Sequence, residues 1–238
     1  MNYIILVAGK GVRLNPLTYN YPKSLYKLGD NKTVLKYLVD SIKTADTKAN
    51  IIVVTGFLAD KLKQDITGVT FINNPFYEVT NSIASLWFAK DYLCDDCVII
   101  NGDTIVSKKL MDEIITKPVK NPCVLLDSSI KTDGDYNVQV HNNNVVAMSK
   151  NLKDYHGEYG GIVLLNPDSA LLLKNEIESM IEDGHYTAWH EDALVQMVFR
   201  YNFKLGYIDI SNYEWTEIDE VDDLVRAQNI YYNDNFKE

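Results

Sequence analysis

The sequence is poor in cysteine and in basic residues, and each shortage excludes a class of protein. Of its 238 residues only three are cysteines, and Cys94 and Cys97 form a single Cys-x-x-Cys without a second pair. We therefore expect reduced thiols rather than a disulfide framework or a zinc site. The 23 Lys and Arg residues are outnumbered by 33 Asp and Glu, which gives a net charge of −10. That balance argues against sequence-independent binding of DNA or RNA.

Long apolar runs and low-complexity segments are also missing. No stretch approaches the length of about 20 apolar residues that spans a membrane. The apolar residues 1–7 lack the basic region and the cleavage site of a signal peptide. No linker or long charge run marks a domain boundary. We therefore expect one cytoplasmic domain over residues 1–238, with neither a membrane nor a nucleic acid as partner.

What the sequence does contain is an alternation of short apolar runs with helical patterns. This alternation predicts an α/β fold, a doubly wound, mostly parallel and Rossmann-like sheet with helices on both faces. Around the turn at 141–144 the pattern changes to short strands, which predicts a small β-rich lid or insertion at about 124–160. The expected core strands are residues 3–7, 51–55, 69–72, 97–100, 160–165 and 205–210. The expected helices begin at about residues 33, 81, 168, 191 and 219.

A glycine-rich loop after the first strand is the most informative segment. The apolar run Tyr3-Ile4-Ile5-Leu6-Val7 is followed by Ala8-Gly9-Lys10-Gly11-Val12-Arg13-Leu14. Glycines let backbone N–H groups approach anionic oxygens, and Lys10, Arg13 and Lys23 can add charge-assisted hydrogen bonds. The segment therefore suits a polyphosphate. It is not a dinucleotide fingerprint or a P-loop, because Leu14 replaces the third glycine and Gly11 follows Lys10.

The whole string resembles the signature loop of the nucleotidyltransferases that activate sugars and small phosphorylated alcohols. That signature runs Leu-x-Ala-Gly-x-Gly-x-Arg-Leu, then Pro-x-x, then Pro-Lys, and every element is present, with Val7 where the family often has Ala. The resemblance implies attack by an acceptor phosphate on the α-phosphorus of a nucleoside triphosphate, with pyrophosphate released. It implies catalytic roles for Lys23 and Arg13. It implies nucleotide binding by Leu6, Ala8, Gly9, Lys10, Gly11 and Gly102.

Such an acceptor is already an anion, so the reaction needs no general base. Catalysis then consists of alignment and of charge neutralisation by cations and a metal ion. Mg²⁺ is the expected cofactor, because it binds one or two carboxylates together with phosphate oxygens. The resemblance assigns Asp103, in the turn Asn101-Gly102-Asp103, and Asp219, before the last helix, as metal ligands, with Glu217 as a further candidate. The alternatives are a turn aspartate and acids at a helix N-terminus.

The segment from Asn73 to Trp87 resembles the branch of this family that makes CDP-linked small molecules, notably the phosphocholine cytidylyltransferases. In that branch an Asn-rich loop and the following Ser-Leu helix start contact the cytosine and the phosphates. Asn81 and Ser85 match the pattern, and Asn73 is a weaker match. The Gln and the Gly-Thr pair of the sugar branch are not found. The resemblance therefore favours CTP as the nucleotide.

Three later segments are implied to bind the acceptor. Lys150 follows the strand-like run 145–149, as a phosphate-binding lysine does in this branch. Aromatic rings next to carboxylates suit a cationic amine, although the same aromatic residues could simply belong to the core or the rim. The expected acceptor-binding residues are Lys150, Tyr159, Trp189, Glu191 and Asp192.

The resemblance is closest to the CTP:phosphoglutamine cytidylyltransferases of capsular phosphoramidate pathways, and it covers nearly the whole chain. The partners are then CTP and a small phosphorylated acceptor, with phosphoglutamine favoured and phosphocholine or 2-aminoethylphosphonate as alternatives. A sugar-1-phosphate nucleotidyltransferase is a rival enzyme. A nucleotide-binding regulatory protein that kept the fold is a rival of another class, since a fold does not fix a function.

Overall fold

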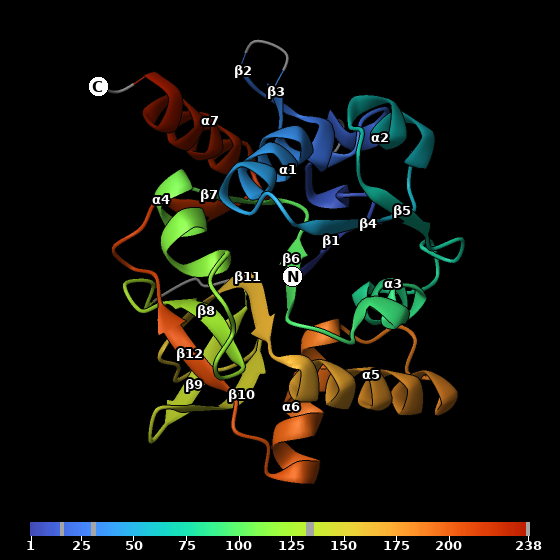
Figure 1. The fold of residues 1–238 in the computed structure, drawn as a ribbon, viewed down its shortest axis with the longest axis vertical. Helices are drawn as coiled ribbons and strands as arrows, with labels where there is room; N and C mark the ends of the chain where they lie inside the picture. The colour runs from blue at the N-terminus through green and yellow to red at the C-terminus, as the bar shows by residue number, and fades with distance from the viewer. Residues whose placement is uncertain (15–16, 30–31, 132–135, 237–238) are drawn as a thin grey trace.

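The computed structural model describes residues 1–14, 17–29, 32–131 and 136–236; Pro16 of the signature string lies outside them. Its centre is a nine-stranded sheet with the main strand order β10-β9-β11-β6-β1-β4-β5 (Figure 1). Four strands in its first half run parallel to one another. They are β1 (Asn2–Val7), β4 (Asn50–Thr55), β5 (Thr70–Asn73) and β6 (Cys97–Asn101).

The strand order reverses at β1. The chain leaves β1 through α1 (Val34–Ala45) to β4, and then through α2 (Ala59–Asp65) to β5. It returns through α3 (Ser82–Phe88) to β6, which pairs with the other side of β1. Because crossovers between parallel strands are right-handed, this reversal puts α3 on the opposite face of the sheet from α1 and α2. Ligands of open α/β sheets bind at such a reversal.

Alternation along β1 explains why both faces of the sheet are covered. Tyr3, Ile5 and Val7 pack with α1 and Leu62 of α2 on one face. Ile4 packs on the other face with residues of α3, α5 (Pro167–Glu182) and α6 (His190–Tyr201). Figure 1 shows these two groups of helices on opposite sides of β1. The unbroken apolar run over residues 3–7 of β1 is what a sheet buried on both faces requires.

The second half of the chain extends the sheet mainly with antiparallel strands. β11 pairs with β6, β8 and β9, and β9 with β10. The segment expected as a lid or insertion thus contributes strands to the same sheet, and the expected α/β fold class is confirmed. These strands are β8 (Cys123–Asp127), β9 (Asn137–His141), β10 (Asn144–Ser149), β11 (Gly157–Leu165) and β12 (Gly206–Asp209).

Two small sheets complete the described structure, and one of them shapes the site. β7 (Thr104–Val106) pairs antiparallel with β13 (Trp215–Glu217), so residues that are far apart in sequence become neighbours. β2 (Lys27–Gly29) pairs with β3 (Lys32–Thr33), and α7 (Val221–Phe236) lies against β2 and β13. The short helical turns are η1 (Val12–Leu14), η2 (Leu17–Tyr19), η3 (Lys23–Leu25), η4 (Lys90–Tyr92), α4 (Lys108–Leu110) and η5 (Met111–Ile115).

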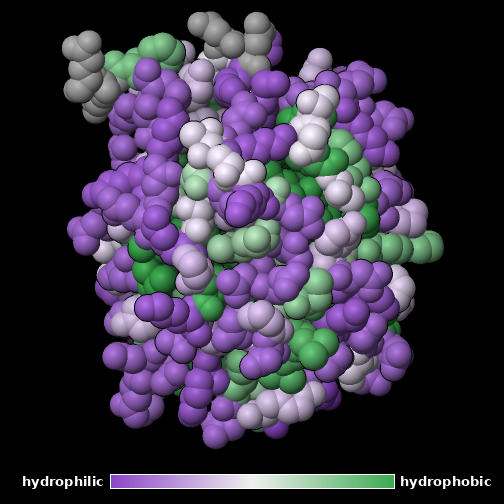
Figure 2. Space-filling model, viewed as in Figure 1, coloured by the Kyte–Doolittle hydropathy of each residue, from purple (hydrophilic) through white to green (hydrophobic). Residues whose placement is uncertain are grey.

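On the face drawn in Figure 2, hydrophilic residues predominate and hydrophobic residues gather in small separate areas. Among the helices of the described ranges, none combines the length and the apolar composition that crossing a membrane requires.

Candidate active site

A cleft of about 440 Å³ opens at the carboxyl ends of β1 and β6, where the strand order reverses. The glycine-rich loop and the start of α3 line one end of it, and residues of β11 and α6 line the other. The position follows the rule for open α/β sheets. Of the residues predicted from the sequence, those lining the cleft are Leu6, Ala8, Gly9, Lys10, Gly11, Arg13, Lys23, Asn81, Ser85, Gly102, Asp103, Lys150, Tyr159, Trp189 and Glu191.

Two glycines allow the close approaches on which this end of the cleft depends. Gly11 has a φ of +63°, and a Cβ there would lie 2.6 Å from Lys23 Cγ. Gly102 N donates to Leu6 O at 2.9 Å, and a Cβ at Gly102 would lie 2.6 Å from the same oxygen. A side chain at Gly11 would displace Lys23, and one at Gly102 would push the turn after β6 away from β1.

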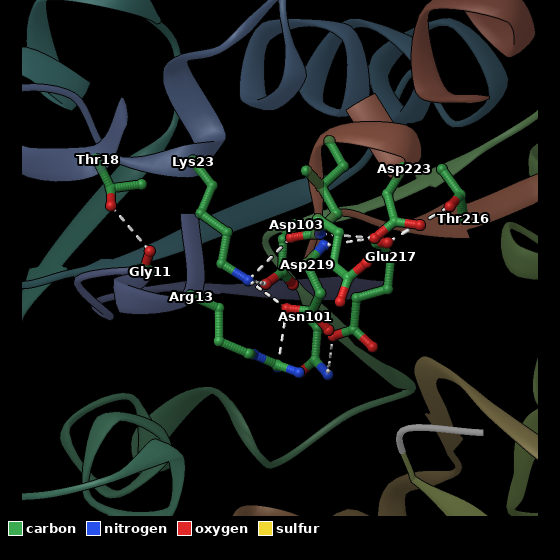
Figure 3. A network of polar contacts seen from close by, with 12 residues as sticks. Gly11, Arg13, Thr18, Lys23, Asn101, Asp103, Thr216, Glu217, Asp219 and Asp223 are labelled. Carbon is green, nitrogen blue, oxygen red and sulfur yellow. Dashed lines mark hydrogen bonds and ion pairs between the residues drawn. The ribbon is translucent and has the colours of Figure 1, made fainter. Parts of the chain in front are cut away.

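Lys23 stands at the centre of a polar network (Figure 3). Its Nζ lies 2.6 Å from Asp103 Oδ2 and 2.8 Å from Asp219 Oδ1, and it donates to Ile218 O at 2.9 Å. Burial alone would lower the pKa of Lys23, but the carboxylates of Asp103 and Asp219 outweigh burial and raise the pKa. The amine therefore stays charged, and it joins the turn after β6 to the segment before α7.

Arg13 reaches the same cluster. Its Nη2 lies 2.8 Å from Asp219 Oδ1, so one carboxylate oxygen contacts two cations (Figure 3). The backbone N–H of Asp219 donates to Asp223 Oδ2 at 2.9 Å, which fixes the segment that carries the carboxylate. The two residues with predicted catalytic roles, Lys23 and Arg13, are thus brought together by one of the predicted metal ligands.

Glu217 is the third acid of the cluster, and its surroundings shift its pKa upward. It ends β13, opposite Thr104, and its Oε1 accepts a hydrogen bond from Asn101 Nδ2 at 3.3 Å. Burial, and then the charges of Asp103 and Asp219, raise its pKa well above the usual range. The environment therefore favours its neutral form.

The pair Asp103 and Asp219 fits a divalent cation. Across the part of the chain that the structure describes, no group of three or more His, Cys, Asp or Glu side chains is arranged as a metal site. Asp103 Oδ2 and Asp219 Oδ1 nevertheless both contact one ammonium, so the two oxygens converge on a single cationic position. Two carboxylates completed by phosphate oxygens are a donor set typical of Mg²⁺.

At the end of the cleft that the glycine-rich loop lines, the start of α3 is held by two asparagines. Asn81 caps the helix, since its Oδ1 accepts from Ser82 N at 2.8 Å. Asn74 is almost fully buried, and its Nδ2 donates to Ser85 Oγ at 3.0 Å and to Thr80 Oγ1 at 3.1 Å. Asn73, the residue predicted from the sequence, is exposed at the end of β5 and lies outside the lining that the described residues form. Asn74 therefore orders the loop before α3.

An ion pair lies beside the glycine-rich loop at the same end of the cleft. Lys10 Nζ lies 2.8 Å from Glu78 Oε1, and both side chains are exposed. The hydrogen bond from Lys10 lowers the pKa of Glu78. Tyr77, whose ring centroid lies 5.8 Å from Lys10 Nζ, also lines the cleft. Glu78 holds Lys10 in place, and a bound polyphosphate would compete for that lysine.

The other end of the cleft contains most of the predicted acceptor residues. Lys150 Nζ lies 4.9 Å from the centroid of the Trp189 ring, a cation–π contact at the rim. Glu191 is buried and lines the cleft. Asp192 lies outside the lining formed by the described residues, because it accepts a hydrogen bond from Trp189 N at 2.8 Å and so caps α6. The structure thus gives the two neighbouring acids different positions.

Burial makes His190 and Glu191 a neutral pair. Their closest atoms, His190 Nδ1 and Glu191 Oε2, are 3.1 Å apart. Burial lowers the pKa of His190 to about 3 and raises that of Glu191 to about 8, so this contact is not an ion pair at neutral pH. His190 N donates to Ser82 Oγ at 2.9 Å, which ties the start of α6 to the start of α3.

Several lining residues were not predicted from the sequence. Tyr136 was missed because nothing local marks it, and it reaches the cleft only because β9 pairs with β11. Asn101 could have been predicted as a cleft residue, since it directly precedes the Gly-Asp turn. The residues added by the structure are Val7, Ser24, Tyr77, Glu78, Thr80, Ser82, Asn101, Tyr136 and Glu217, of which Glu217 had been a further candidate.

Comparisons with known proteins identify the family and the fold. Residues 2–122 match the family described as nucleotidyl transferase. A CTP:phosphoglutamine cytidylyltransferase of Campylobacter jejuni is 36% identical over 110 residues, which cover 45% of this chain and 42% of the relative. A 2-aminoethylphosphonate cytidylyltransferase of Lancefieldella rimae is 24% identical over 236 residues, 97% of this chain and 93% of the relative.

The fold is shared with solved structures. A structure of the CTP:phosphocholine cytidylyltransferase of Streptococcus pneumoniae has a TM-score of 0.77 at 20% identity, covering 97% of this chain and 98% of that one. Three curated relatives have a higher identity to this chain, and the match spans 31%, 42% and 51% of their own lengths. The match over residues 2–122 covers the glycine-rich loop, the start of α3 and the turn after β6. The chain therefore belongs to the nucleotidyl transferase family.

Proposed function

We propose that this protein is a cytidylyltransferase that transfers CMP from CTP to a small phosphorylated acceptor and releases pyrophosphate. The observation that carries the proposal is the position of Lys23. Its ammonium contacts Asp103 and Asp219 in a cleft whose one end is a glycine-rich loop and whose other end is lined by aromatic and acidic residues. A triphosphate and an anionic acceptor can therefore meet beside a fixed positive charge.

The proposed step is a displacement at phosphorus. An oxygen of the acceptor phosphate forms a bond to the α-phosphorus of CTP, while the bond from that phosphorus to the bridging oxygen breaks. Pyrophosphate leaves with the electron pair, and no proton has to move. Lys23 and Arg13 lie where they can neutralise the charge that develops on the phosphoryl oxygens. The backbone of Gly9–Gly11 and Lys10 would bind the β- and γ-phosphates.

Asp103 and Asp219 are the residues that would hold Mg²⁺. When bound, the ion would neutralise phosphate charge and favour the departure of pyrophosphate. Lys23 would then have to move from between the two carboxylates, which would free its ammonium for the reacting phosphate. Glu217 and Asn101 would keep the shape of the cluster, since their hydrogen bond joins the turn after β6 to β13.

For the acceptor we propose a small phosphorylated amine or amino acid, with phosphoglutamine favoured. The support is the combination of Lys150, Trp189 and Glu191 at one end of the cleft, together with the relatives' names. Phosphocholine and 2-aminoethylphosphonate remain alternatives. A cytoplasmic location and use of the product in capsule or surface polysaccharide modification are part of the same proposal.

The test is pyrophosphate release with CTP or UTP, Mg²⁺ and each acceptor, compared with Lys23→Ala. We expect turnover with CTP and a phosphorylated amine, and almost none in the variant. Turnover with UTP and glucose-1-phosphate would instead indicate a sugar nucleotidyltransferase. CTP binding without turnover on any acceptor would indicate a nucleotide-binding regulatory protein.

A further inference from the structure

Three buried polar atoms at the acceptor end of the cleft have no partner. They are the hydroxyl oxygens of Tyr136 and Tyr159 and the Oε2 atom of Glu191, and all three residues line the cleft. Each side chain is at least nine-tenths buried. Within the described part of the chain, none of these atoms makes a hydrogen bond. Buried polar groups are nearly always paired, so three such atoms in one place require an explanation.

The three atoms belong to one cluster. The rings of Tyr136 and Tyr159 are 6.0 Å apart between centroids, in an edge-to-face arrangement. Tyr159 N donates to Tyr136 O at 2.8 Å, and both residues line the same cleft as Glu191. Burial raises the pKa of both phenols, Glu191 raises both further when it is ionised, and Asp192 also raises that of Tyr136. His190 does not satisfy Glu191 Oε2, since the 3.1 Å contact does not meet hydrogen-bond geometry and His190 Nδ1 is paired with Ser82 Oγ at 3.2 Å.

We propose that this cluster receives a primary ammonium group of the acceptor, and that it discriminates against a trimethylammonium group. An R–NH₃⁺ group has three N–H donors, and the cluster offers three unpartnered oxygens. A trimethylammonium group has no donor and would leave all three oxygens unpaired. The inference rests on the proposed function and narrows its acceptor to amines such as phosphoethanolamine, 2-aminoethylphosphonate or an α-amino acid phosphate.

Aromatic rings alone would not make this distinction. Cation–π attraction serves a quaternary ammonium as well as a primary one, and Trp189 at the rim suits both. The discriminating feature is the set of three unpartnered oxygens on Tyr136, Tyr159 and Glu191. A site built to hydrogen-bond an N–H group rejects an analogue that lacks it much more strongly than an apolar pocket rejects an extra methyl group. The hydroxyls of Tyr136 and Tyr159 are therefore the proposed determinants of specificity.

The experiment compares phosphoethanolamine with phosphocholine, which differ only in three N-methyl groups. Pyrophosphate release with CTP gives kcat/KM for each, and titration calorimetry gives the Kd of each acceptor without turnover. We expect at least about a tenfold preference for phosphoethanolamine in both readouts. The variants Tyr136→Phe and Tyr159→Phe should reduce this preference, while Tyr232→Phe, on exposed α7, should not.

The same variants give a readout that needs no ligand. Removing an unpartnered buried hydroxyl removes a desolvated group without breaking a hydrogen bond. Tyr136→Phe and Tyr159→Phe should therefore melt at or above the wild-type temperature in the absence of acceptor. A clear drop in both melting temperatures would show that the hydroxyls are already paired, and it would overturn the proposal.

The outcomes separate this inference from the proposed function. A preference for phosphocholine, equal use of both acceptors, or calorimetric binding of neither would overturn the inference. Preferential binding of phosphoethanolamine without pyrophosphate release from CTP would support the inference while the proposed function fails. Turnover with phosphocholine alone would support the proposed function and reject the inference.

Discussion

The ammonium of Lys23 and the carboxylate of Asp103 lie 2.6 Å apart although 80 positions separate them in the sequence. Their contact joins η3, which follows the glycine-rich loop, to the turn after β6. Because Lys23 Nζ also contacts Asp219, the same amine links the first, middle and last parts of the chain.

Lys23→Ala should lower kcat by about 10²- to 10³-fold, the usual effect of removing one group that stabilises the transition state. The Kd of CTP should change little, because Lys10 and the backbone of the glycine-rich loop remain. Pyrophosphate release measures the first quantity and calorimetric titration with CTP the second. Lys27→Ala, at an exposed position of β2, is the matched control. Undiminished turnover would remove Lys23 from the mechanism.

Lys23→Met should also make the stability of the protein depend more strongly on Mg²⁺. The lysine neutralises Asp103 and Asp219, and its side chain is only 15% exposed. Without it, two carboxylates face each other beside half-buried Glu217, at a cost of about 3 kcal/mol. Melting curves should show a larger Mg²⁺-induced rise in the variant than in the wild type. Equal rises in the two proteins would indicate that the carboxylates do not share a cation site.

Glu191 should make the protein less stable as the pH rises. Its pKa is about 8 in the folded protein, raised mainly by burial from a usual value of 4.5. Between these two values the folded state binds more protons than the unfolded state, so the free energy of unfolding falls with increasing pH. For this one group the fall is at most about 1.4 kcal/mol per pH unit. Other groups around this carboxyl are His190, Asp192, Lys150, Asn101, Tyr136, Tyr159 and Glu217.

Glu191→Gln should therefore flatten this part of the stability profile. Urea unfolding at pH values from about 5 to 8 gives the comparison, because glutamine keeps the shape of the side chain but does not titrate. Asp192→Asn is a useful control, since it changes the neighbouring acid that caps α6. If wild type and Glu191→Gln lose stability equally over this range, the carboxyl group is not held neutral in the folded protein.

Asn74→Ala should destabilise the protein and weaken CTP binding. The substitution removes the donor to Ser85 and Thr80 and leaves the buried Ser85 Oγ without this partner, at a cost of about 1–3 kcal/mol. The loop before α3 would lose its order, and the KM for CTP would rise. Asn73→Ala, at the exposed neighbouring position, serves as the control for both melting temperature and KM. If Asn73→Ala raised the KM for CTP more than Asn74→Ala, Asn73 would be the nucleotide-binding residue, as predicted from the sequence.

The sequence predicted those parts of the fold that local patterns determine. Unbroken apolar runs predicted β1, β4 and β6 because both faces of these strands are buried. The helix starts at about residues 33 and 81 were predicted from residue type, and the side chains of Thr33 and Asn81 each accept a hydrogen bond within the first turn. In the same way, the glycine-rich loop was predicted because it is a continuous string of residues.

The parts of the fold and of the site that the sequence did not predict depend on contacts between distant segments. β7 and β13 are three-residue strands that pair with each other although they lie over a hundred positions apart in the sequence. No local pattern predicts this pairing. The choice between Asn73 and Asn74 turns on a single step along an extended chain, which reverses the direction of a side chain. Tyr136 could not be predicted, because its place in the cleft depends on the pairing of β9 with β11.

The cleft divides along the chain as well as in space. The end lined by the glycine-rich loop is built before residue 104, within the segment matched by the family, and the end proposed for the acceptor is built after residue 135. The two ends are joined by the pairing of β11 with β6 and by the hydrogen bond from His190 N to Ser82 Oγ. A lineage of such proteins could therefore replace the acceptor end and keep the rest of the cleft, provided that β11 retained its register with β6. A chimera that exchanges residues 136–192 between two relatives would carry its choice of acceptor with that segment.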